Sequence, residues 1–128
     1  MRMRNDLIYP ELCYQIVGIL YDVFNEIGSG HRELVYQRSL EKAFKENKIK
    51  FKSQVYAPIT YKDEIVGKNY LDFLIEDKIV LEIKKDTIFR KPFINQVYSY
   101  LKAKNLQLGI VANFTREGIR FKRIVNIV

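Results

Sequence analysis

The sequence predicts an α/β (α+β) fold in which a central mixed β-sheet is flanked by helices. Two segments with helical spacing of apolar residues come first, and an alternating pattern typical of strands follows. A third helical segment then separates these strands from two final ones, which gives the order α-α-β-β-β-α-β-β. The 128 residues contain no linker rich in proline, glycine or serine and no internal repeat. We therefore expect one domain spanning residues 1–128.

Each predicted helix has apolar residues at helical spacing and a recognisable start or end. The first covers residues 11–27, with Pro10 at its start and Gly28 at its end. A short loop, "GSGHRE", leads to a second helix over about 33–47. The third helix covers residues 92–104 and begins with a proline.

Three predicted strands lie between the second and third helices, and two follow the third helix. The segment "IKFKSQVYAPITY" alternates, as a half-exposed strand does, and "KDE" reads as a turn. Gly67 marks a bulge or bend in the strand that follows. "TREG" forms the turn between the last two strands. After the alternating segment, the predicted strands cover residues 65–75, 79–85, 106–114 and 119–128.

Composition and charge limit the classes of function. There are 22 basic and 15 acidic residues, a net charge of +7, and such a surface favours nucleic acid or an anionic membrane. The single cysteine, Cys13, excludes a disulfide within one chain and fits a reduced, cytoplasmic setting as a small core residue. The first residues have no apolar core of a signal peptide, and "IVGIL" is far too short to span a bilayer, so no membrane association is expected.

The stretch "YLDFLIEDKIVLEIKK" predicts a β-hairpin that carries charges in unexpected places. With Glu76–Lys78 as its turn, Asp72 lies opposite Glu82, with β-carbons about 5 Å apart. Lys84 shares their face, because side chains alternate along a strand. A turn one residue different in length would place Leu81 opposite Asp72 instead. The other face is wholly apolar, and its residues are Leu71, Phe73, Ile75, Ile79, Leu81 and Ile83.

Two facing carboxylates repel each other, and a bound divalent cation reverses that interaction. Magnesium is usually held by one or two carboxylates together with water and phosphate oxygens. With a lysine one step away, this constellation is typical of a metal-dependent phosphodiesterase. The alternative is that the three charges lie on a solvent face and form ordinary surface ion pairs.

Several motifs together resemble a known family. Asp72, followed ten residues later by Glu82-Ile83-Lys84, resembles the motif of the PD-(D/E)xK nuclease superfamily. "GSGHRELVY" resembles the signature of the small GxxExxY proteins, a branch of that superfamily, through Gly30, Glu33 and Tyr36. "INQVYSYLKAKNLQLGIVANF" resembles that branch's helix–strand segment, and "KRIVN" also fits.

The resemblance extends from about Ile8 to Asn126 and implies a restriction-endonuclease-like core. This agrees with the element order that the hydrophobic pattern predicts. Leu71 stands where the motif's proline would be, a position that varies between branches of the superfamily.

The resemblance also implies roles for individual residues. Asp72 and Glu82 would bind Mg²⁺ or Mn²⁺, with the backbone carbonyl of Ile83 as a third oxygen ligand and Glu33 as a ligand, direct or through water. Lys84 would orient or activate the attacking water or stabilise charge on the phosphate.

Other residues would assist. Gln96, in the third helix, would hold the water or Lys84 in place, and Tyr36 and Tyr100 would support the site from the faces of their helices or belong to the core. Lone His31 is expected to be a solvent-exposed loop residue, with contact to a phosphate as the alternative. Basic residues from segments flanking the site are candidates for contacts with a nucleic-acid backbone: Arg32, Lys84, Lys85, Arg90, Lys91, Lys102 and Lys104. The alternative is an ordinary basic surface.

We therefore expect a Mg²⁺- or Mn²⁺-dependent nuclease that acts on DNA or RNA. A homodimer fits this activity, because cutting both strands of a duplex needs two sites. The alternative is a nucleic-acid-binding or partner-binding module on the same fold with little or no activity. A third reading is an accessory structural protein whose acidic pair is only a surface feature.

Overall fold

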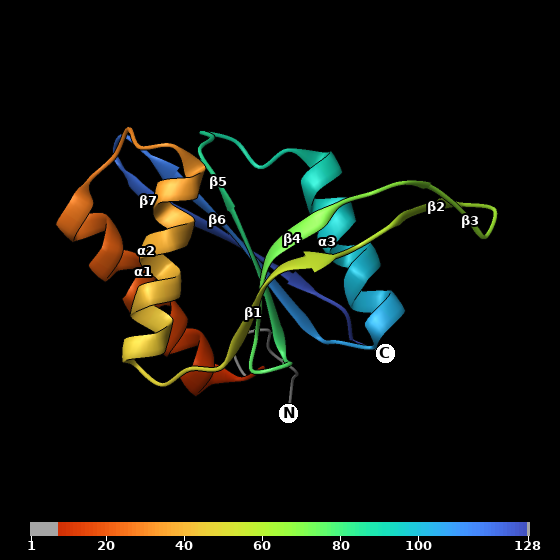
Figure 1. Cartoon of the computed structure of the whole chain (residues 1–128), viewed down its shortest axis with the longest axis horizontal. Coiled ribbons are helices and arrows are strands. Elements are labelled where there is room, and N and C mark those ends of the chain that lie inside the picture. The colour runs from red at the N-terminus through yellow and green to blue at the C-terminus, as the bar shows by residue number, and fades with distance from the viewer. Residues whose placement is uncertain (1–7, 128) are drawn as a thin grey trace, which may run out of the picture.

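The computed structural model describes residues 8–127. Residues 1–7, and Val128 of the predicted last strand, lie outside this range. Three helices and seven strands follow in the order α1, α2, β1–β5, α3, β6, β7 (Figure 1). Their bounds are α1 Pro10–Ile27, α2 Glu33–Glu46, β1 Phe51–Tyr56, β2 Ile59–Tyr61, β3 Glu64–Gly67, β4 Tyr70–Ile75, β5 Ile79–Lys84, α3 Lys91–Lys104, β6 Leu108–Thr115 and β7 Gly118–Val125.

The central sheet has five strands in the order β1-β4-β5-β6-β7. Only β5 and β6 are parallel, because α3 crosses over between them, and the other neighbours are antiparallel. The predicted mixed sheet flanked by helices is therefore confirmed. This is the architecture of a restriction-endonuclease-like core.

The element order differs from the prediction in the middle of the chain. Two predicted strands each break in two, at Ala57–Pro58 and at Lys68–Asn69, so β2 and β3 form a separate antiparallel pair. Pro58 has no N–H with which to continue the ladder. The predicted bend at Gly67 lies where the β2–β3 register shifts beside Ile59. This pair, called the arm below, extends beyond the central sheet past α3 (Figure 1).

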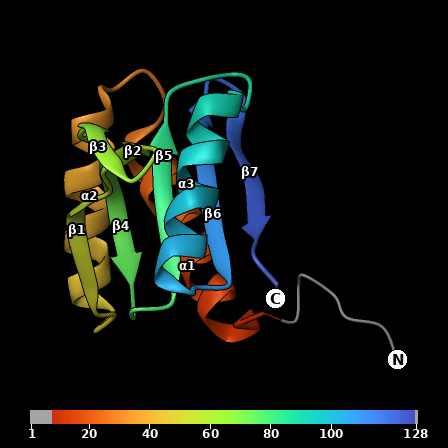
Figure 2. The same ribbon diagram turned by 90° about the vertical axis from the view of Figure 1, so that its right-hand side faces the viewer.

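The helices cover both faces of the sheet (Figure 2). On one face, the buried residues Ile16 and Leu20 of α1 and Leu40 and Phe44 of α2 pack with alternate residues of the inner strands. No helix among residues 8–127 is long and apolar enough to cross a membrane.

On the other face, Val97 and Leu101 of α3 pack in a second buried cluster with Val80 and Val111. This packing is close at Gly109 of β6, where an added Cβ would lie 2.5 Å from Cγ1 of Val97. Both sides of the inner strands are thus buried, as is typical where a parallel pair lies between helices.

The predicted register of the hairpin is confirmed over three pairs, Phe73–Leu81, Leu74–Val80 and Ile75–Ile79. The prediction that Leu71 shares the face of Phe73 is wrong, because Leu71 belongs to the cluster beneath α3. Between the pairs Ser53–Phe73 and Val55–Leu71, the ladder of β1 and β4 omits both Asp72 and Gln54, whose φ is 53°. The regular alternation of faces is interrupted at this point.

Candidate metal centre

The candidate site begins where the ladder between β4 and β5 ends. Beyond the pair Phe73–Leu81, Asp72 and Glu82 do not pair through their main chains. Instead, the N–H of Asp72 donates to Oε1 of Glu82 at 2.9 Å, and the N–H of Ile83 donates to Oδ2 of Asp72 at 2.7 Å. Each carboxylate thus takes the place of a main-chain carbonyl from the neighbouring strand. The two acids lie together as predicted, and they bridge the gap between the strands.

The acidic pair is buried, which the sequence argument did not anticipate. Glu82 is only 4 % exposed, and Asp72 is partly buried. The face they share is covered further along by α3, where Leu74 and Val80 are buried. The alternative of a solvent face with ordinary surface ion pairs is therefore wrong.

Burial changes the ionisation of both acids. Burial is the main reason that the pKa of Glu82 rises to about 7, and the negative charge of Asp72 raises it further. Burial also raises the pKa of Asp72, against the lowering effect of the hydrogen bond from the backbone of Ile83. Both shifts disfavour the state in which the two acids are ionised at the same time.

Lys84 lies beside this pair. Its Nζ is 3.4 Å from Oε2 of Glu82, and it lies over the ring of Phe93 at 3.7 Å from the centroid. Only 19 % of its side chain is exposed, so it is not a freely solvated surface lysine. The contact with Glu82 confirms the predicted shared face. The aromatic ring and the carboxylate together fix the position of the ammonium group.

Glu33 is the first residue of α2 and approaches the same region. Its Oε2 accepts a hydrogen bond of 3.0 Å from the N–H of Lys85, directly after β5. Its negative charge contributes to the raised pKa of Asp72. Within residues 8–127, however, no three histidine, cysteine or acidic side chains converge as a ready-made metal site.

The donor set nevertheless fits a hard divalent cation. Two buried carboxylates that disfavour simultaneous ionisation would gain from a cation between them. Asp72 and Glu82 would hold it by side-chain oxygens, and Ile83 offers a backbone carbonyl between Glu82 and Lys84. Carboxylate and carbonyl oxygens are the ligands that magnesium and manganese prefer.

Comparison with known proteins agrees with this geometry. The sequence profile of the PD-(D/E)XK nuclease superfamily matches residues 10–124, nearly the whole chain. The chain belongs to this superfamily. Nucleases of the superfamily generally use divalent metals, which suits the oxygen donors described above. No curated protein matches the sequence.

A similar fold occurs among solved structures. The crystal structure of SSO0001 superposes with a TM-score of 0.53 at 19 % sequence identity. The match covers 96 % of this chain and 60 % of that one, so this chain spans about three fifths of the length of SSO0001. At this identity the likeness is one of fold.

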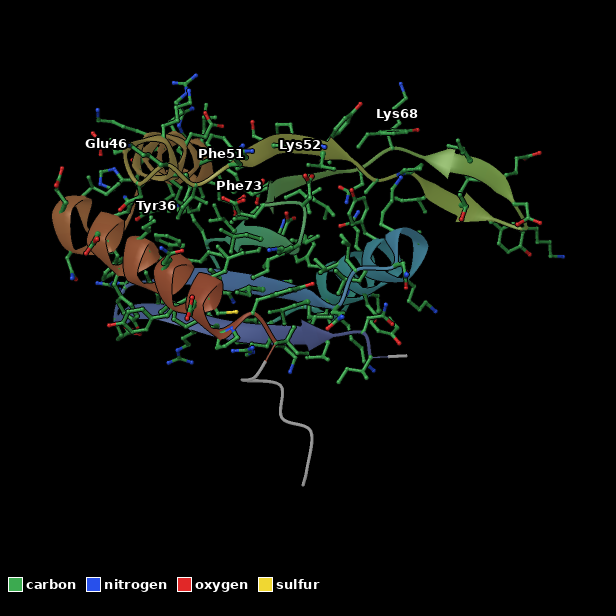
Figure 3. The ribbon with its side chains drawn as sticks, turned by 90° about the horizontal axis from the view of Figure 1, so that it is seen from below. Tyr36, Glu46, Phe51, Lys52, Lys68 and Phe73 are labelled. Carbon is green, nitrogen blue, oxygen red and sulfur yellow. The ribbon has the colours of Figure 1, made fainter. Side chains whose placement is uncertain are left out.

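Tyr36 fastens the loop that leads into α2. It is fully buried, and its hydroxyl donates to the carbonyl of Gly28 at 2.7 Å and accepts from the N–H of His31 at 3.4 Å. Figure 3 shows its side chain between α2 and the body of the fold. His31 is half-buried rather than solvent-exposed as expected, and its Nε2 lies 2.7 Å from the carbonyl of Ile27. Tyr36 therefore fixes the position of the loop before Glu33.

The two α3 residues that the resemblance assigned to the site, Gln96 and Tyr100, make no hydrogen bond or ion pair with the acidic pair Asp72 and Glu82 among residues 8–127. Gln96 and Tyr100 line a groove between α3 and the arm. No hydrogen bond links Gln96 to Asp72, Glu82 or Lys84 in the described part of the chain. Tyr100 is 8 % exposed and belongs mainly to the cluster beneath α3, and burial raises the pKa of its hydroxyl.

The predicted phosphate-contacting residues other than Lys84 are exposed: Arg32, Lys85, Arg90, Lys91, Lys102 and Lys104. Arg90 is held by an ion pair with Asp86, whose pKa it lowers. The carboxylate of Asp86 also accepts from the N–H groups of Thr87 and Ile88, so this acid orders the loop between β5 and α3.

Sequence reasoning missed Phe93 and Asn113. Asn113 is 1 % exposed, pairs with Lys84 in the parallel ladder, and donates from Nδ2 to the carbonyl of Ile88 at 2.9 Å. Its Oδ1 has no hydrogen-bond partner in the part of the chain that the structure describes. The available signal was one amide in the otherwise apolar "GIVANF". Phe93, directly after Pro92, looked like an ordinary helix residue.

Proposed function

We propose that this chain is a metal-dependent nuclease of the GxxExxY branch that hydrolyses phosphodiester bonds in nucleic acid. One observation carries the proposal: a buried pair of carboxylates, Asp72 and Glu82, lies at the diverging ends of two strands with an ammonium group 3.4 Å from one of them. Assignment to the branch rests on Gly30, Glu33 and Tyr36, which lie in and after the loop before α2.

Different residues would bind the metal ion, stabilise charge on the phosphate and position water. Asp72 and Glu82 would hold Mg²⁺ or Mn²⁺, together with the carbonyl of Ile83 and with Glu33, directly or through water. When bound, the cation supplies polarisation of a phosphoryl oxygen and activation of water. Lys84, positioned by Phe93, would stabilise negative charge that develops on the phosphate or orient the attacking water. Gln96 would help to position water from α3.

Nucleic acid is the substrate that suits the charge of the chain. The net charge is +7, and exposed basic residues lie before α2 and in the loop after β5. Contacts of this kind bind the phosphate backbone without reading sequence.

A second candidate function is a nucleic-acid-binding module with little activity. The observation in its favour is that both carboxylates are already satisfied by backbone N–H groups while no third acidic or histidine side chain joins them among residues 8–127. In this case the pair would serve mainly to join β4 and β5.

Cleavage assays separate the two functions. Labelled single- and double-stranded DNA and RNA are incubated with the protein and Mn²⁺, Mg²⁺ or a chelator. We expect metal-dependent cleavage by the wild type and a loss of at least about 100-fold in Asp72→Asn and Lys84→Met, since such groups act on the transition state.

The exposed ion pair of Lys52 and Asp77, 3.3 Å apart, provides matched controls. Lys52→Met and Asp77→Asn make the same chemical changes outside the site and should cleave like the wild type. Cleavage that survives Asp72→Asn or chelator would refute the proposal. Binding that weakens with salt, without cleavage of any substrate, would favour the binding module.

A further inference from the structure

A large groove lies between the arm and α3. It has a volume of about 820 Å³, within the range of pockets that hold small molecules. One wall comes from the segment that leads into and out of the arm, and the other comes from α3. Figure 1 shows this segment running past α3.

The groove adjoins the candidate metal centre. Phe93 lines the groove, and its ring also lies 3.7 Å from Nζ of Lys84. Gln96, one turn further along α3, lines the groove as well. A strand whose phosphate reached Lys84 could therefore continue directly into the groove.

The lining combines rings, amides and positive charge. Tyr56, Phe93 and Tyr100 contribute aromatic rings, and Asn69, Asn95 and Gln96 contribute side-chain amides. Among residues 8–127, one charged side chain lines the groove, the basic Lys104, and no acidic side chain does. Nδ2 of Asn69 has no hydrogen-bond partner within the described part of the chain.

This chemistry matches unpaired nucleotides. Rings provide surfaces on which bases stack, amides can pair with base edges, and a groove without acidic side chains tolerates phosphates. A duplex hides the faces of its bases and would leave the rings of the groove uncovered. An apolar partner helix would in turn leave the amides without hydrogen bonds.

We propose that this groove binds an unpaired segment of the substrate strand next to the scissile phosphate. The inference rests on the proposed nuclease function and adds the substrate class: single-stranded nucleic acid, or a duplex with a single-stranded extension. The arm and α3 hold the unpaired bases, while the acidic pair and Lys84 face the phosphate.

A groove-filling variant tests the proposal by binding alone. Ser99 lines the groove from α3 and is exposed, so Ser99→Trp places a bulky ring in the groove without touching the acidic pair. The matched control is Gln15→Trp, at an exposed position of α1 on the opposite face of the sheet. Fluorescence anisotropy is measured with a labelled single strand and with a blunt duplex, in chelator to prevent cleavage.

We expect Ser99→Trp to weaken binding of the single strand by about tenfold or more, the scale of one lost base stack, and to change duplex binding less than about twofold. Gln15→Trp should bind like the wild type. Ala103→Glu, which adds a negative charge at another exposed position of the groove, should also weaken single-strand binding. It gives an independent result if the tryptophan disturbs folding.

Two results would overturn the proposal. One is unchanged single-strand affinity in folded Ser99→Trp and Ala103→Glu. The other is a dimer that dissociates in Ser99→Trp while oligonucleotide affinity stays the same, because the groove would then bind a second copy of the chain. Failure of the nuclease function looks different: groove variants would still lose single-strand binding, but the wild type would cut nothing.

Discussion

Replacing Glu82 by glutamine should change how stability depends on pH. The pKa of Glu82 rises from 4.5 to about 7 on folding, mainly because the side chain is buried. The folded state therefore binds the proton more tightly than the unfolded state. The stability associated with the protonated group is fully present below pH 4.5 and is lost as pH rises through about 7.

The size of this effect follows from the same values. At ~1.4 kcal/mol per pH unit, a pKa raised from 4.5 to about 7 corresponds to about 3 kcal/mol, as an upper bound for a pair that shares protons. Glutamine has the shape of the protonated acid and cannot ionise. In Glu82→Gln, we expect unfolding free energies near those of the wild type at pH 4.5 and higher by up to about 3 kcal/mol at pH 8.

Urea unfolding of both proteins in chelator, from pH 4.5 to 8, measures this difference. Asp77→Asn serves as a control, because Asp77 is an exposed acid in a surface ion pair, and its difference from the wild type should vary little over this range. The reasoning would be refuted if the difference between Glu82→Gln and wild type stayed constant with pH. It would also be refuted if the variant became less stable than the wild type as pH rose.

Two further substitutions test the packing around the site by the same unfolding measurement. Gly109→Ala should destabilise by about 1–3 kcal/mol, because its Cβ would lie 2.5 Å from the buried side chain of Val97. Gly18→Ala, in an open position of α1, should instead stabilise the protein by about 0.5–1 kcal/mol. Equal changes in unfolding free energy for the two alanine variants would contradict this account. Tyr36→Phe should destabilise by about 1 kcal/mol, because the carbonyl of Gly28 loses its hydrogen bond, and an unchanged unfolding free energy would refute the role of that bond.

The hairpin with the acidic pair was the most predictable part of the fold. Its polar turn lies between two apolar runs, and both Glu76 and Asp77 adopt positive φ values there, so the turn fixes the register. Once the register is fixed, alternation places Glu82 and Lys84 on one face. The same logic failed at Leu71, because alternation holds only while the strand is regular, and the ladder between β1 and β4 is interrupted at Gln54 and Asp72.

Other features depend on tertiary contacts that no local pattern reveals. Glu82 is buried although it is an acid near the end of the hairpin, and the helix that covers the same face at Leu74 and Val80, α3, follows later in the sequence. The arm arises where Pro58 and Asn69 interrupt two otherwise continuous strand patterns. The contact of Lys84 with Phe93 depends on the path of the loop between β5 and α3. For this reason the sequence predicts which charged residues form the site better than it predicts the burial and the aromatic contact around them.

The central claim is that Asp72 and Glu82 together bind a divalent cation. The most direct test is the anomalous scattering of Mn²⁺ in crystals of the wild type and of Asp72→Asn soaked with manganese. We predict a peak about 2 Å from carboxylate oxygens of both Asp72 and Glu82 in the wild type, with Glu33 linked directly or through water, and no such peak in the variant. A wild-type crystal with manganese bound elsewhere but none between these two carboxylates would contradict the claim.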